Sequence, residues 1–159
     1  MKRSILVLIT FAFLFTACNS NQGVSKVFSK YAHKEGVTAI TVPGWVISLG
    51  VLFADLSDEE NELLSSIDKV KILSIENETL NKNVNLHQEF FDEINKNHEY
   101  EELLSVREEN ENVTIFGKMD ESVIHEMIVL VGGNDNAIIY FKGEIKPELI
   151  NNTMHLTNS

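Results

Sequence analysis

The second half of this chain is a series of short apolar segments separated by turns. Residues 100–106, 113–117, 123–131 and 137–141 each have the alternating or continuous apolar pattern of a β-strand. The clearest break is Gly132-Gly133-Asn134-Asp135-Asn136, a turn-forming sequence. Because consecutive strands joined by short turns pair antiparallel, this half predicts an antiparallel sheet that is mostly a meander.

The first half contains most of the helical patterns. Residues 24–32 have apolar side chains at helical spacing, and Gly36 is a candidate C-cap after them. Further segments are assigned by the same periodicities: strands at 37–42 and 70–75, and helices at 57–67, 85–95 and 147–154. Helices come early and strands late, so the predicted class is α+β, with helices packed on one face of the sheet.

Two segments allow two interpretations each. Residues 100–106 alternate like a strand, but Glu101-Glu102-Leu103-Leu104 could also extend the preceding helix. Residues 45–53, from Trp45 to Phe53, form an apolar run that predicts a buried core helix. The alternative for this run is an exposed apolar patch that docks a partner.

The N-terminus has the pattern of an export signal. Lys2 and Arg3 precede residues 5–17, which carry no charge and end at Cys18. This apolar run is shorter than the roughly 20 residues that cross a bilayer as a helix. The string Leu14-Phe15-Thr16-Ala17-Cys18 resembles the lipobox of bacterial lipoproteins, although Phe15 stands where Leu is usual. We therefore expect a signal peptide at 1–17, a lipidated tether at 18–23 and one α+β domain at 24–155.

Cys18 is the only cysteine of the chain, which bears on its role. A single thiol in an exported protein forms no intramolecular disulfide, and lipidation of Cys18 explains why the residue is present. Each acyl methylene inserted in a membrane contributes about 0.8 kcal/mol, so two or three chains, palmitate among them, hold a protein firmly. The alternative is an ordinary secretory signal that ends near a cysteine by chance.

The net charge excludes one class of partner. Cleavage before Cys18 leaves 11 basic against 24 acidic residues, so the formal charge falls from −11 to −13. Nucleic acid binding depends on Lys and Arg contacts to phosphates, so no nucleic acid partner is expected. For the same reason, membrane attachment is expected through lipid on Cys18 and not through surface charge.

The sequence contains no catalytic motif. No two of the five histidines (His33, His87, His98, His125 and His155) have metal-ligand spacing. His125 and Glu126 are neighbours in a predicted strand and therefore point to opposite faces. Glu76 and Glu78 would share a face if the second strand reached them, and the acids at 58–62 are expected to cap a helix and face water. We predict no catalytic, metal or cofactor residue.

Several strings, taken in order, resemble one protein family. They are Tyr100-Glu101-Glu102-Leu103-Leu104-Ser105-Val106-Arg107, then the segment from Val123 to Gly133 with its acid Glu126, and finally Phe141-Lys142-Gly143-Glu144-Ile145. Over roughly residues 24–150 the chain is similar to the DUF4252 family of small lipoproteins found mainly in Bacteroidota. The resemblance implies an exported lipoprotein with a compact α+β domain, and it implies no activity. Members are often encoded near extracytoplasmic sigma factors, which suggests envelope signalling.

Three functions agree with these observations. The first is a membrane-anchored, non-enzymatic envelope module that binds an envelope protein or a small ligand. The second is a periplasmic hydrolase that acts through carboxylates or His125, and the third is a structural envelope lipoprotein. The residues after Cys18 have no acidic cluster of the kind that resembles a surface-export signal. The expected location is therefore the periplasmic face of the outer membrane.

Overall fold

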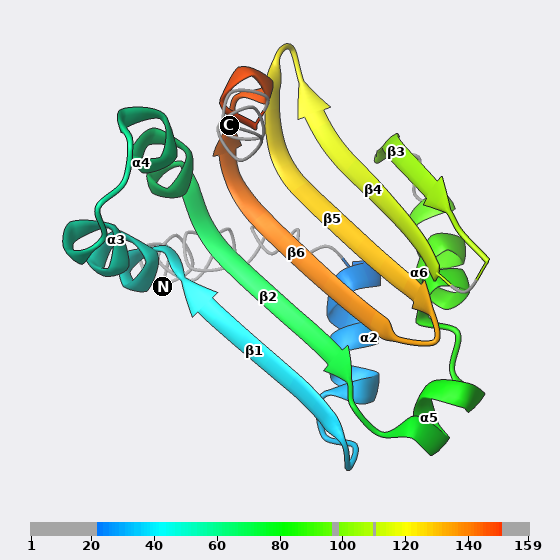
Figure 1. The fold of residues 1–159 in the computed structure, drawn as a ribbon. Helices are drawn as coiled ribbons and strands as arrows, with labels where there is room; N and C mark the ends of the chain where they lie inside the picture. Colours follow the sequence, from blue (N-terminus) through cyan, green and yellow to red (C-terminus); the bar gives the residue numbers. More distant parts are fainter. Residues whose placement is uncertain (1–21, 97–98, 110, 151–159) are drawn as a thin grey trace, which may run out of the picture.

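Six strands form one antiparallel sheet in the order β1-β2-β6-β5-β4-β3 (Figure 1). The computed structural model describes residues 22–96, 99–109 and 111–150. The strands are β1 (Val37–Pro43), β2 (Ile67–Ile75), β3 (Glu101–Arg107), β4 (Glu111–Asp120), β5 (Val123–Gly133) and β6 (Asn136–Ile145). From β3 to β6, chain order and sheet order agree, which confirms the predicted meander and the α+β class. β2 pairs with β6, and β1 pairs with β2, which completes the sheet.

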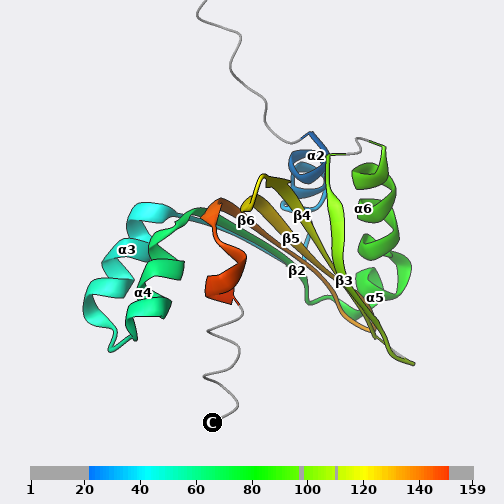
Figure 2. The ribbon, with the colours of Figure 1, turned by 90° about the horizontal axis from the view of Figure 1, so that it is seen from above.

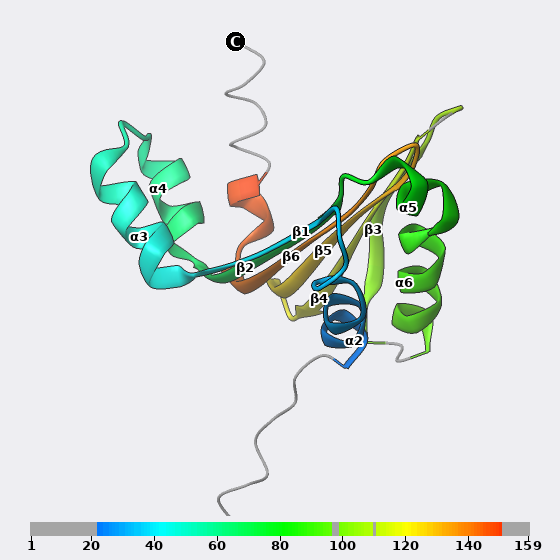
Figure 3. The ribbon, with the colours of Figure 1, turned by 90° about the horizontal axis from the view of Figure 1, so that it is seen from below.

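The helices lie in two groups. They are α2 (Gln22–Tyr31), α3 (Gly44–Phe53), α4 (Asp58–Ser65), α5 (Glu78–Asn83) and α6 (Leu86–Asn95), with a further helical turn at 147–150. Figures 2 and 3 show α2 and α6 side by side on one face of the sheet. The same views show α3, α4 and the turn at 147–150 on the other face, near the end of the sheet where β1 finishes.

The main core lies between the sheet and the α2–α6 pair. Val24 and Val27 of α2 and Phe90 of α6 pack on Leu73 and Ile128 of the sheet, and all five are buried. The apolar stripe predicted for α2 is therefore the stripe that is buried. Because strand side chains alternate between faces, only every second residue of β2, β5 and β6 enters this core.

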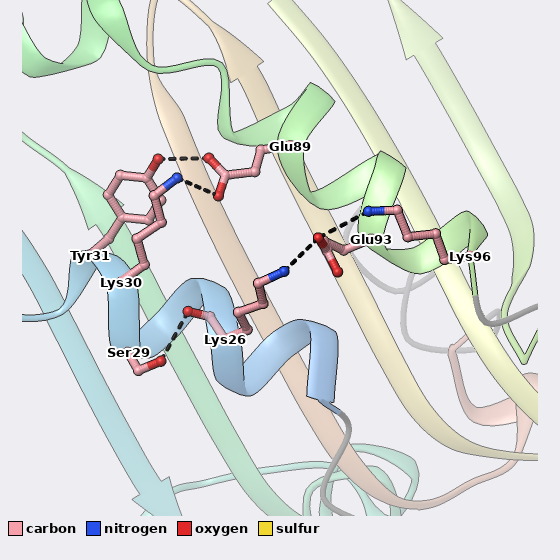
Figure 4. A network of polar contacts seen from close by, with 7 residues as sticks. All are labelled: Lys26, Ser29, Lys30, Tyr31, Glu89, Glu93 and Lys96. Atoms are coloured by element: carbon pink, nitrogen blue, oxygen red, sulfur yellow. Dashed lines mark hydrogen bonds and ion pairs between the residues drawn. The ribbon is translucent and has the colours of Figure 1, made fainter.

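Polar contacts join α2 to α6 along the solvent side of this core (Figure 4). Glu89 accepts hydrogen bonds from Lys30 Nζ at 2.8 Å and from the Tyr31 hydroxyl at 2.7 Å. Glu93 pairs with Lys26 at 2.8 Å and with Lys96 at 3.1 Å. Burial raises the pKa of the Glu89 carboxyl, but the hydrogen bonds from Lys30 and Tyr31 outweigh it, so the pKa lies below its ordinary value.

A smaller second core lies on the other face of the sheet, at one end. Ile67, Ile124 and Ile145 are its buried residues, and Ile47 of α3 packs against them. The other side chains in this cluster are Leu63, Leu64, Val70, Met127, Phe141 and Ile150. These contacts hold α3, α4 and the turn at 147–150 against the sheet.

Several sequence predictions need correction. Helices were predicted on one face of the sheet, but α2 and α6 lie on one face and α3 and α4 on the other. β2 begins at Ile67, which was expected inside the preceding helix, and β6 runs four residues past the predicted end at Phe141. Gly36 is not the C-cap of α2, which ends at Tyr31; Gly36 has φ +73° in the turn before β1 and lies against Asn77.

Two further helix assignments differ from the prediction. The short helix α5 was not predicted, because the six residues after its cap Asn77 are too few to show a helical periodicity. The alternative of a helix at 100–106 is wrong, since this segment is β3, and residues 151–154 of the predicted closing helix lie outside the described residues.

Candidate interaction surface

The sheet face opposite α2 and α6 carries two rows of side chains that cross all six strands. We call these two rows the open face. The first row is Thr38, Ser74, Ala137, Val131, Val113 and Val106, and the second is Ile40, Ile72, Ile139, Val129, Ile115 and Leu104. Neither row contains a charged residue. In a chain with a formal charge of −11, an uncharged surface of this breadth is a strong departure from the overall composition.

Burial distinguishes the open face from the face under the helices. Ile128, Leu130 and Ile138, which point toward α6, are fully buried, whereas their neighbours Val129 and Ile139 on the open face are only partly buried. The ends of the second row are exposed, with Ile40 at 46 % and Leu104 at 50 % of the full area of the residue. The helices of the described chain therefore cover one face of the sheet and only one end of the other.

Helix α3 extends this apolar surface. Trp45, Leu52 and Phe53 are 67 %, 76 % and 89 % exposed, and no residue of α3 is buried. The prediction of a buried core helix at 45–53 is wrong. Periodicity could not reveal this, because α3 is apolar on every side and only its place in the fold decides which side chains are covered.

Two contacts fix α3 in this exposed position. A Cβ on Gly44 would lie 2.9 Å from the carbonyl oxygens of both Ile67 and Asp68, so the helix starts in direct contact with the backbone of β2. Ile47 then packs in the second core. The rest of the helix projects away from the sheet, as Figure 3 shows. Its side chains Leu49, Leu52 and Phe53 are exposed.

The opposite end of the open face is bordered by acids. A pocket of about 570 Å³ begins at Ser74 of the first row and includes Glu76, Glu78 and Asp135 in its lining. A second pocket of about 370 Å³ shares Asp135 and is lined also by Glu108, Glu109 and Glu111. We call these six acids the acidic rim. Lys82, 4.0 Å from Glu78, is the one basic residue that lines either of these two pockets.

Buried asparagines hold the part of the acidic rim at α5 and the β5–β6 turn in place. The Asn136 side chain donates to Asn81 Oδ1 at 2.6 Å and accepts from the Leu86 backbone N–H at 3.1 Å. Asn81 donates in turn to the Asn134 carbonyl at 2.5 Å. Asn136 and Asn81 are both buried, so the network ties α5 and the start of α6 to the turn between β5 and β6.

The carboxylates singled out in the sequence have separate roles. Ser57 and Glu60 form a reciprocal capping box at the start of α4, so the prediction of a helix cap is confirmed for Glu60. Asp58 and Glu59 lie in the first turn, and Glu62 pairs with Lys146 at 2.9 Å. Glu76 and Glu78 do not share a strand face, because the second strand does not reach them: β2 ends at Ile75, and Glu78 belongs to α5. Glu76 accepts a hydrogen bond from the Thr38 hydroxyl at 2.6 Å.

The described histidines lie apart from one another. His33 follows α2, His87 lies on α6 and His125 on β5, while His98 and His155 fall outside the described residues. His125 lines neither of the two pockets described above. Across residues 22–96, 99–109 and 111–150, no three His, Cys, Asp or Glu side chains gather as metal ligands do.

Two polar contacts resemble parts of catalytic sites, but each contains a group that is buried or already hydrogen-bonded. The His87 Nε2 lies 2.8 Å from the hydroxyl of Thr114, which is 2 % exposed, and burial lowers the pKa of His87 with help from the Arg107 charge. Glu126 accepts hydrogen bonds from the hydroxyls of Tyr100 at 2.5 Å and Tyr140 at 2.9 Å. Burial, followed by the interactions with Glu126, raises the pKa of both phenols, so they stay protonated as donors. We interpret both contacts as structural.

Comparison with known proteins gives the family. Residues 31–153 match a family described as "Domain of unknown function (DUF4252)", which is well over half of the chain. The chain belongs to the DUF4252 family. The match spans all six strands, α3 and the acidic rim, so the candidate surface lies within the DUF4252 domain. Neither the curated proteins nor the solved structures that were searched gave a match.

The family string Gly143-Glu144 has a physical explanation in this DUF4252 domain. Gly143 of β6 lies against the backbone of Ser66, leaving no room for a Cβ, and the Glu144 N–H donates to the Ser66 carbonyl at 3.0 Å. Cys18 and the predicted signal peptide lie outside the described residues. None of the helices in the described part of the chain is long and apolar enough to span a bilayer.

Proposed function

We propose that this protein is a non-enzymatic binding module of the bacterial envelope, held to a membrane by lipid on Cys18. Its proposed binding surface is the open face together with α3. One observation carries the proposal: two uncharged rows cross the whole sheet and continue toward a helix whose apolar side chains are exposed. Exposed apolar areas of this extent are typical of interaction sites.

The charge pattern favours one kind of partner. The acidic rim borders the open face at one end. Its six acids have one basic residue beside them in the lining of these two pockets, Lys82. An apolar surface next to concentrated negative charge is complementary to a polypeptide segment with an apolar side and basic groups. We therefore infer an amphipathic, basic segment of another envelope protein as the partner.

Binding is a better account of this surface than hydrolysis. A hydrolase needs a base, a nucleophile or an activated water, and room for a substrate. Thr114, the group in contact with His87, is buried, and Glu126 is occupied by two tyrosine hydroxyls. The open face, by contrast, is partly exposed along both rows and contains no ionisable group.

The location proposed for this module is the periplasmic face of the outer membrane in a Bacteroidota cell. The lipobox-like string before Cys18 supports a lipid anchor, and the tether to α2 is only a few residues long. The family's association with sigma factors supports a role in envelope signalling. Partner binding at the open face would then be the event that is signalled.

Trp45 allows a direct test of binding. It is the only tryptophan in the sequence and is exposed, so its fluorescence emission shifts to shorter wavelength when a ligand covers it. The probes are two synthetic amphipathic helical peptides with the same apolar side, one with lysines and one with glutamates on the polar side. We expect saturable binding of the lysine peptide, and binding at least tenfold weaker for the glutamate peptide.

A pair of variants locates the binding. Val129→Lys introduces a charge in the middle of the open face, and Gln88→Lys introduces the same charge at an exposed position on α6. Val129→Lys should abolish the fluorescence change and Gln88→Lys should leave it intact. Equal binding by both variants, or equal affinity for both peptides, would refute the proposal.

A further inference from the structure

The two edges of the sheet differ in their protection against pairing. β3, at one edge, carries Glu101, Glu102 and Arg107, and its pairing with β4 is interrupted by a bulge between Glu102 and Leu104. Charges and bulges on an edge strand prevent it from pairing with another chain. β3 is therefore a protected edge.

β1, at the other edge, has neither kind of protection. Its sequence Val-Thr-Ala-Ile-Thr-Val-Pro contains no charged residue, and its pairing with β2 runs from Val37 to Pro43 without a register shift. Ala39, Ile40 and Thr41 are exposed in the middle of the strand. Pro43, which lacks an N–H, stands only at the end. A regular, uncharged edge of this length is a template for adding another strand.

We propose that β1 pairs antiparallel with β1 of a second copy of this chain, around a two-fold axis at Ile40. The two sheets would then form one continuous sheet with the two open faces on the same side. β1 contributes Thr38 and Ile40 to the open face, but the pairing would use the outer edge of β1, and the inference stands on the edge strands and not on partner binding.

The side chains of β1 are complementary to themselves in this register. Ile40 would lie opposite Ile40 of the partner copy, and Ala39 would lie opposite Thr41 of the partner copy. Thr38 would face Val42 of the partner copy, so no like charges meet. In a chain with a formal charge of −11, few surfaces can approach a second copy without charge repulsion, and β1 is one of them.

Among the residues that the structure describes, the fold also leaves space for this pairing. Helix α3 continues from the end of β1 and does not run along its outer edge, as Figure 1 shows. Ile40, 46 % exposed, ends the second row of the open face. Pairing would place it between Ile72 of its own chain and Ile40 of the partner copy, so the row would continue across both copies.

The mass of the protein in solution tests the proposal. The full chain is extracted from membranes in a mild detergent and examined by analytical ultracentrifugation as wild type, Ile40→Lys and Leu104→Lys. The two variants are matched, because Ile40 and Leu104 end the same row at opposite edges and are almost equally exposed. We expect dimers for wild type and Leu104→Lys, and for Ile40→Lys a dimer at least tenfold weaker or a monomer. A monomeric wild type, or equal behaviour of the two variants, would overturn the proposal.

Disulfide crosslinking in intact membranes tests the register. Directly opposite residues in an antiparallel pair have Cβ atoms about 4.5–5.5 Å apart, and a disulfide needs about 3.5–4.5 Å, so a small local movement lets an opposed pair crosslink. Oxidation of Ile40→Cys should give a covalent dimer, whereas Val106→Cys, exposed on β3, and wild type with Cys18 alone should not. Dimers through Val106 and not through Ile40 would contradict pairing at β1. The peptide titration above separates this outcome from a failure of the proposed binding function, because it reads the open face and not the edge.

Discussion

Gly143 of β6 lies so close to the carbonyl oxygen of Ser66, the residue before β2, that the backbone leaves no space for a Cβ. Ser66 also accepts the Glu144 N–H at 3.0 Å, so the two segments are joined where the pairing of β2 with β6 shifts register. We expect Gly143→Ala to lower the free energy of unfolding by about 1–3 kcal/mol, because backbone atoms must move to relieve the overlap. Gly50→Ala is the control: nothing lies near Gly50, and alanine in a helix interior should stabilise by about 0.5–1 kcal/mol. Urea unfolding of both variants checks the opposite signs.

Phe53 and Phe90 should respond very differently to truncation. Phe53 ends α3 with 89 % of its area exposed, while Phe90 of α6 is fully buried in the main core. Phe90→Ala should cost about 3–5 kcal/mol of stability, and Phe53→Ser should change it by less than about 0.5 kcal/mol. Thermal or urea unfolding measures both. A cost for Phe53→Ser comparable to that for Phe90→Ala would mean that α3 is covered.

Asn136 should be critical for the acidic rim. Its side chain is buried and both donates to Asn81 and accepts from the Leu86 N–H. Asn136→Ala leaves these buried partners without a hydrogen bond, which should cost about 1–3 kcal/mol in urea unfolding. Asn83→Ala, on the exposed side of α5, removes a local hydrogen bond to the Thr79 carbonyl and should cost less than about 1 kcal/mol. Equal costs would show that the buried hydrogen bonds of Asn136 stabilise the fold no more than the exposed hydrogen bond of Asn83.

The contacts between α2 and α6 predict a pH dependence. The pKa of Glu89 is lowered in the folded state, so its stabilising contribution is present above the unfolded pKa and is lost as the pH falls through the folded pKa. The hydrogen bond from Lys30 to Glu89 raises the pKa of Lys30, so that contribution is lost only as the pH rises past the folded lysine pKa. Glu89→Gln should therefore cost up to about 1 kcal/mol near neutral pH and less below about pH 4. Urea unfolding of wild type and variant at the two pH values measures the difference, and a cost that grows in acid would contradict it.

Cys18 is tested by fractionation. If lipid on Cys18 holds the protein, then Cys18→Ala should move it from the membrane to the soluble fraction or leave its signal peptide uncleaved, which mass spectrometry distinguishes. Wild type should carry a diacylglycerol-modified N-terminal cysteine. An unchanged membrane fraction containing a cleaved Cys18→Ala protein would refute the anchor.

Local patterns alone determined most of the elements. Alternation and turn residues predicted β3 to β6, the apolar stripe of α2 predicted its buried side, and Ser57 with Glu60 predicted the start of α4. These predictions succeed because caps, turns and periodicity depend on residues within one or two turns of the chain. Glu126 and Asn136 gave no such signal, because their partners Tyr100 and Asn81 come from distant segments.

Only the tertiary structure decided which apolar residues are covered. Residues 123–131 form a strongly apolar strand with apolar side chains on both faces, but α2 and α6 cover only one of these faces. Residues 45–53 were predicted as core for the same reason, and the structure leaves them exposed as α3. Burial is a property of what the fold brings near a side chain, and apolar character is a property of the side chain itself. In the open face, α3 and the unprotected edge at β1, apolar side chains stay exposed. The proposals made for this protein rest on these places.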